Sequence, residues 1–88
     1  MTIETVLEER GKRYGVFADH AAISQSLKDV MRVTPGWDRL APDQREALEM
    51  VQHKVARILN GSADYIDSWT DGSGYFTLVE QRLTKEQS

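Results

Sequence analysis

The segment "PDQREALEMVQHKVARILNG", residues 42–61, constrains the fold most, because it carries signals for both ends of one helix. Pro42 suits the first helical position, Asp43 favours the positive end of the helix dipole, and Asn60-Gly61 is typical of a helix terminus. At 3.6 residues per turn, an apolar stripe and a polar stripe lie on opposite sides. The apolar stripe, which we expect to face the core, comprises Leu48, Val51, Val55, Ile58 and Leu59; the polar stripe comprises Glu46, Glu49, His53, Arg57 and Asn60.

Three further segments have helical patterns. The first starts at a threonine N-cap, Thr2 or Thr5, and runs to about Tyr14, where Gly15 can end it. The second covers residues 17–33 and stops before Pro35 and Gly36. Its apolar residues are Phe17, Ile23, Leu27, Val30 and Met31. The last covers residues 62–83, with Tyr65, Trp69, Phe76, Val79 and Leu83 along one face.

These patterns predict an all-α fold, a small helical bundle of three to four helices in a single domain over residues 1–88. A chain of this length buries only about 60 to 65% of its unfolded surface, so a core of its own is marginal. We therefore expect the bundle to be completed by homo-oligomerisation.

Composition excludes several classes of protein. The sequence has no cysteine, which excludes disulfides and thiolate metal sites, and no apolar run of about 18 residues that could span a membrane. The N-terminal segment lacks the apolar centre of a signal peptide, so we expect a cytoplasmic protein. The net charge of −3 offers no broad basic surface for duplex nucleic acid.

Acidic residues on two successive helices form a candidate metal site. Glu46 and Glu49 make an E-x-x-E pair, and the last helix carries Asp64, Asp67 and Asp71 on one face. Asp64 and Asp67 also suit the opening turns of a helix, whereas Asp71 lies further in. Carboxylates converging from two helices can hold Mg²⁺. Gly72 with Gly74 would either permit the helices to approach closely or kink or break the last helix. The alternative is a solvated acidic face without a ligand.

Basic and aromatic residues supply candidate contacts for a phosphorylated ligand. Lys54 and Arg57 lie one turn apart and could bind phosphate or pair with nearby acids. Arg10, Lys12 and Arg13 form a second basic cluster. His53, close to the acidic pair, is the candidate for proton transfer, with an exposed helix-surface histidine as the alternative, whereas His20 is expected to be a hydrogen-bonded core residue. Tyr75 could stack on a base, as could Trp69, although aromatic residues at this spacing more often pack in a core.

Three stretches of the sequence carry a resemblance: "ERGKRYGVFADHA", "LAPDQREALEMVQHKVARILNG" and "DSWTDGSGY". They resemble a family of short, uncharacterised phage and prophage proteins over nearly the whole chain. More distantly, the acidic helix and the D-x-x-x-D-x-x-x-Y segment are similar to MazG-like all-α nucleoside triphosphate pyrophosphohydrolases and to phage nucleotide-modification-associated domains. The resemblance implies an oligomeric bundle that uses Mg²⁺ to split a nucleotide, and a location in the host cytoplasm. The doubled first acid of the enzymes' E-E-x-x-E motif is missing here.

Three functions stay open at this point. The first is a Mg²⁺-dependent nucleotide pyrophosphohydrolase, whose turnover would depend on Asp67 and Asp71. The second is a non-catalytic protein that sequesters a nucleotide and depends mainly on Lys54, Arg57 and the N-terminal basic cluster. The third is a helical module that binds a host protein through its acidic face.

Overall fold

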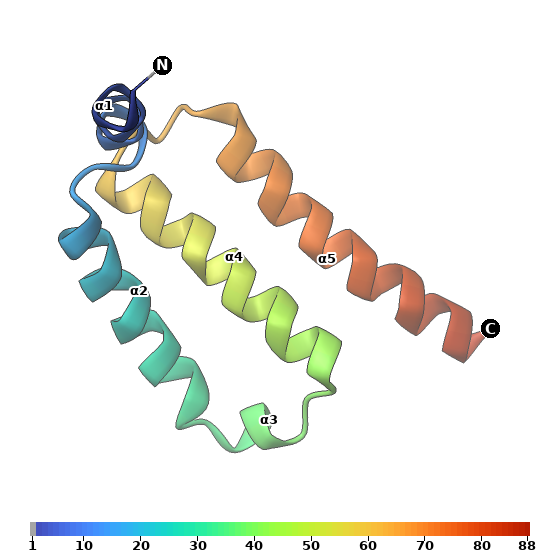
Figure 1. Ribbon diagram of the computed structural model, residues 1–88. Helices are drawn as coiled ribbons and strands as arrows, with labels where there is room; N and C mark the ends of the chain where they lie inside the picture. The colour runs from blue at the N-terminus through green and yellow to red at the C-terminus, as the bar shows by residue number, and fades with distance from the viewer. Residues whose placement is uncertain (1) are drawn as a thin grey trace.

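The computed structural model describes residues 2–88, which form five helices and no strand. The helices are α1 Ile3–Tyr14, α2 Phe17–Arg32, α3 Pro35–Asp38, α4 Pro42–Asn60 and α5 Ile66–Gln87 (Figure 1). The all-α prediction is confirmed, but the predicted number of three to four helices was wrong. The additional helix is the single turn α3, which occupies the segment where the sequence predicted only a break. Pro35 stands at its start, where the missing N–H of proline is not needed.

The helices form one layer rather than a closed bundle. α4 lies in the middle, α2 and α5 run antiparallel to it on its two sides, and α1 crosses the end of the layer, seen nearly end-on in Figure 1. The radius of gyration is 15.3 Å, compared with about 12 Å for a compact domain of this length. The layer therefore has two broad faces open to solvent.

Small and polar side chains make the contacts inside this layer. Ala56 is completely buried, Ala47 and Ser68 nearly so, and Ser24 of α2 donates a hydrogen bond to Oε1 of Gln52 on α4 at 3.1 Å. Among residues 2–88, no large side chain is fully buried. The apolar stripe predicted to face a core is in fact exposed at Val55 and Leu59, because α2 and α5 pack beside this stripe rather than over it. Homo-oligomerisation, which would cover it, stays a prediction.

The connections on either side of α4 are each held by specific hydrogen bonds, and the one before α5 is longer than the sequence predicted. α5 begins at Ile66 instead of residue 62, so Asp64 lies in the connection before the helix. A hydrogen bond from the indole Nε1 of Trp69 to the carbonyl of Ala63, 2.8 Å long, folds this connection against the first turn of α5. At the other end of α4, Arg45 donates to the carbonyls of Trp37 and Asp38 and so attaches α3 to the layer.

Of the helices in the described part of the chain, none combines the length and apolar character needed to cross a membrane.

Candidate functional site

The two glutamates of the predicted metal site lie in different surroundings. Glu49 faces α2, where its carboxylate accepts a 2.7 Å hydrogen bond from Arg32 and lies 3.8 Å from Nζ of Lys28. Glu46 is exposed and borders a shallow hollow between α4 and α5, which Asp43 and Tyr75 also line. The structure thus directs Glu49 away from the helix that carries the aspartates.

The aspartates also have separate partners. Asp71 forms an ion pair with Lys54 of α4 at 3.0 Å, and Asp67 accepts a hydrogen bond from the hydroxyl of Tyr65 at 3.0 Å. Asp64 is exposed in the connection that precedes α5. Within residues 2–88, no group of three or more acidic or histidine side chains is placed to hold a metal ion. The magnesium site therefore stays a prediction from the sequence.

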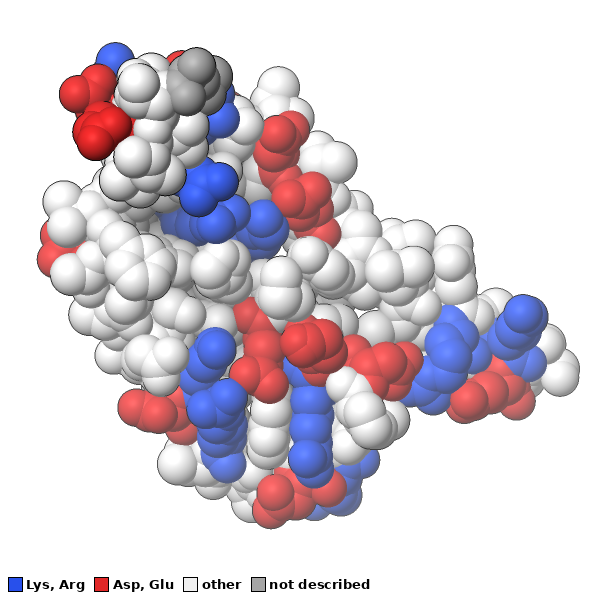
Figure 2. Space-filling view, viewed as in Figure 1, with Lys and Arg blue, Asp and Glu red and all other residues white. Residues whose placement is uncertain are grey.

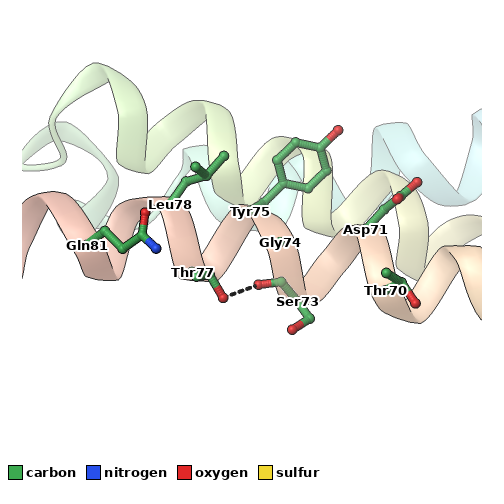
Figure 3. A pocket seen from close by; sticks show the side chains of 8 residues that line it. All are labelled: Thr70, Asp71, Ser73, Gly74, Tyr75, Thr77, Leu78 and Gln81. Carbon is green, nitrogen blue, oxygen red and sulfur yellow. Dashed lines mark hydrogen bonds between the residues drawn. The ribbon is translucent and has the colours of Figure 1, made fainter.

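Tyr75 lies on an open groove along α5 (Figure 3). Every residue that lines this groove comes from α5 itself, and the side chains are Asp71, Tyr75 and Leu78 on one flank and hydroxyl groups on the other. The hydroxyl of Thr77 is occupied by a hydrogen bond to the carbonyl of Ser73. None of the described residues that line the groove is cationic, which makes it a poor match for a phosphorylated ligand.

A more enclosed cleft lies where α1, α2 and α4 meet, and its volume is about 420 Å³. Three of the site residues predicted from the sequence line it, namely Arg10, His53 and Arg57. The remaining lining residues are Leu7, Gly11, Tyr14, Gly15, Val16, Phe17 and His20. Figure 2 shows basic side chains gathered at the foot of α1 on the face of the layer that bears the cleft. The structure thus joins the N-terminal basic cluster to the polar stripe of α4.

A close backbone contact fixes α1 in place beside the cleft. Asn60 at the end of α4 donates from Nδ2 to the carbonyls of Tyr14 and Val16, at 2.8 and 2.9 Å. Gly15, between α1 and α2, has a φ of 78°, and a Cβ there would overlap the backbone of Asn60. A Cβ on Gly61 would likewise overlap the backbone of Arg13, whose carbonyl accepts from the N–H of Ser62 at 2.7 Å. Only glycine permits this approach on both sides.

The inner end of the cleft holds the two histidines of the chain. The rings of His20 and His53 meet edge to face with their centroids 4.7 Å apart. His20 is buried, as the sequence predicted, but its Nδ1 has no hydrogen-bond partner among residues 2–88. Burial, followed by the nearby charge of Arg57, lowers the pKa of both rings, that of His53 to about 4. Both are therefore neutral at pH 7, and His53 is a weak base for the proton transfer predicted for it.

The arginines and aromatic rings stand toward the mouth of the cleft. The guanidinium of Arg57 lies 4.2 Å from the centre of the Tyr14 ring, a cation–π contact. Arg10 projects from α1 and is exposed, and Phe17 at the start of α2 is 79% exposed. The other members of the basic cluster do not line the cleft: Arg13 packs over the ring of Tyr65 at 5.0 Å, and Lys12 is exposed on α1.

This arrangement has the chemistry of a binding site for a flat, negatively charged molecule. Arginine guanidiniums bind phosphate oxygens through paired hydrogen bonds, and aromatic faces stack on planar rings. Neutral imidazoles can donate or accept one hydrogen bond on each nitrogen, but Nδ1 of His20 is itself buried, so a ligand in the cleft would contact the more accessible ring of His53. Sequence reasoning missed Tyr14, Phe17 and His20 as lining residues, because the cleft depends on the packing of α1 and α2 on α4, including the Gly15–Asn60 contact, which no local pattern indicates.

Comparison with known families gives one finding. Residues 2–83 match the model of a domain of unknown function, DUF6378, and the chain belongs to this family. No curated protein and no solved structure matches the chain. The family description names neither an activity nor a ligand, so the phage and MazG-like resemblance stays a prediction.

Proposed function

We propose that this member of the DUF6378 family binds a nucleotide in the cleft between α1, α2 and α4. The observation that carries the proposal is the composition of the cleft: two arginines, two neutral histidines and two aromatic rings around one cavity. Its volume of about 420 Å³ lies within the usual range for small-molecule sites and is sufficient for a mononucleotide. The phosphates would contact Arg10 and Arg57, and the base would lie against Tyr14 or Phe17.

Binding without turnover is the form of this function that the contacts favour. Glu49 and Asp71 are each held by basic side chains, and the pKa of His53 is too low for an efficient base near pH 7. We therefore expect a bound nucleotide to be recovered unchanged. Hydrolysis that requires Mg²⁺ is the alternative implied by the sequence resemblance, and chromatography of the recovered ligand distinguishes the two.

Calorimetric titration of the chain with nucleoside triphosphates and cyclic dinucleotides, with and without Mg²⁺, tests the proposal. Arg10→Gln and Lys12→Gln form a matched pair, because each removes one positive charge from an exposed position on α1 but only Arg10 lines the cleft. A lost charge-assisted hydrogen bond corresponds to roughly a 10- to 100-fold weaker affinity.

We expect that loss for Arg10→Gln and a small change for Lys12→Gln. Equal losses in the two variants would mean that only general attraction to a basic surface is measured, and absence of binding to every nucleotide tested would disprove the proposal.

The cleft is formed within one chain, so this function does not depend on assembly. The predicted homo-oligomer is a separate proposal.

A further inference from the structure

The two broad faces of the helical layer differ in chemistry, and α4 shows why. Its residues Gln52 and Ala56 point toward α2, whereas Ala47 and Lys54 point toward α5. These two directions are nearly opposite around the helix, which leaves two free sides. One free side carries His53 and Arg57 and belongs to the face with the cleft. The other carries the apolar stripe of α4.

The same division holds for the flanking helices. On α5, Leu78 lies beside Glu46, which is on the same side of α4 as His53 and Arg57, and at 100° per residue Trp69 and Phe76 fall on the far side. On α2, Lys28 and Arg32 reach Glu49 on the cleft side, which places Ile23, Leu27 and Val30 on the far side. Together these residues define an apolar face: Ile23, Leu27 and Val30 of α2; Leu48, Val51, Val55 and Leu59 of α4; Trp69, Phe76 and Leu83 of α5.

Large side chains on the apolar face are strongly exposed in the single chain. The exposed fractions are 66% for Val30, 67% for Leu59, 59% for Trp69 and 55% for Phe76. The residues of this set are apolar, and Glu80, one turn after Phe76 on α5, is a charged neighbour at its edge, whereas Figure 2 shows a band of charged side chains across the opposite face. A contiguous apolar surface of this extent on all three long helices is a feature of interaction sites.

The total exposed area of the chain is also larger than that of a typical folded monomer. The chain exposes 6356 Å², whereas a folded monomer of 10.0 kDa typically exposes about 5,200 Å². The excess of about 1,100 Å² exceeds the area of about 800 Å² that each partner buries in a stable interface of standard size. A second helical layer of equal size, packed on the apolar face, would bury this excess area.

We propose that the missing layer is a second copy of this chain, packed face to face through the apolar face. A domain needs two packed layers around a core, and this chain supplies only one. Because no large side chain among residues 2–88 is completely buried in the single layer, a folded chain needs its second layer at all times. An identical chain is the partner that is always present. A two-fold axis through the α4 stripes brings the same surface of each copy together, which is the commonest form of homodimer. Both ligand clefts then face outward.

A matched pair on α5 tests this interface. Phe76 and Leu78 are exposed to similar extents, 55% and 64%, but Phe76 is on the apolar face and Leu78 lies beside Glu46 on the opposite one. Sedimentation of the wild-type chain should give twice 10.0 kDa, and Leu78→Lys should leave this mass unchanged. Phe76→Lys should raise the dimer dissociation constant about 30-fold or more, since it replaces a buried aromatic contact by a charge.

A cross-linking experiment covers the case in which Phe76→Lys fails to fold. The chain has no cysteine, so Val55→Cys and Leu78→Cys each introduce a single thiol. A short bismaleimide should link two Val55→Cys chains and leave Leu78→Cys chains unlinked. A folded wild-type chain of 10.0 kDa, or cross-linking through position 78 instead of position 55, would overturn the proposal.

Discussion

Replacement of Asn60 by alanine tests how the cleft is built. The side chain of Asn60 donates two hydrogen bonds across the α1–α2 connection, to the carbonyls of Tyr14 and Val16 at 2.8 and 2.9 Å. Each such bond contributes about 1 kcal/mol net, so Asn60→Ala should lower the free energy of unfolding by about 2 kcal/mol. For a domain of this size that corresponds to a fall in Tm of roughly 10 °C.

Urea denaturation followed by circular dichroism measures the effect, with Gln25→Ala, at an exposed position of α2, as the control. Since α1 forms one wall of the cleft, Asn60→Ala should also weaken nucleotide binding while the helix content stays close to that of the wild type. If Asn60→Ala and Gln25→Ala unfold at the same urea concentration, the connection is not held by Asn60 and the account of the cleft fails.

Three further predictions concern backbone, charge and pH. Gly15→Ala should lower Tm by several degrees because its φ of 78° and the neighbouring Asn60 backbone exclude a Cβ, whereas Gly11→Ala, in the open interior of α1, should leave Tm unchanged or raise it. Asp71→Asn should cost about 1 kcal/mol in urea unfolding through loss of the Lys54 ion pair, with nucleotide affinity unaffected. Stability should fall as the pH drops from 6.5 toward 4, because burial lowers the pKa of folded His53 to about 4, and the unfolded chain therefore binds more protons in this range.

Each of these predictions has an outcome that contradicts it. Equal melting temperatures of Gly15→Ala and Gly11→Ala would show that the connection relaxes freely. A loss of nucleotide affinity in Asp71→Asn would indicate that α5 takes part in binding. For the pH dependence, the control is His53→Gln, and a slope of stability against pH that is the same in this variant would show that His53 does not cause it.

The sequence predicts the helices well where apolar periodicity and end signals agree. For α4, Pro42 and Asn60 are both the observed ends. The start of α5 was predicted four residues too early, because an aspartate such as Asp64 is typical of the first turn of a helix. The connection before α5 is instead folded by a hydrogen bond from Trp69, which no local pattern indicates. The pattern also cannot show whether an apolar stripe is covered by the same chain, and this is why the stripe of α4 was assigned to a core.

The candidate site was only partly predictable for a related reason. Arg10, His53 and Arg57 attract attention through their charge or chemistry, and all three line the cleft. The apolar pattern of the second helix assigned His20 and Phe17 to a core. Their position beside Arg57 depends on the packing of helices far apart in the sequence, including the contact between residues 15 and 60, and no local pattern shows it. Close approach of the backbone at Gly72 and Gly74 was one of two interpretations, beside a kink or break of the helix, but a Cβ at either would meet nothing within 4 Å, and α5 continues through both; the close approach occurs at Gly15 and Gly61 instead.

The histidine ring signals in a nuclear magnetic resonance titration test the central claim most directly. The chain contains two histidines, and both line the cleft. Addition of a nucleotide at constant pH should shift the Cε1–H signals of His20 and His53 together, and both shifts should saturate at one nucleotide per chain. Nucleotide binding detected by calorimetry while neither histidine signal moves would place the ligand elsewhere and contradict the account.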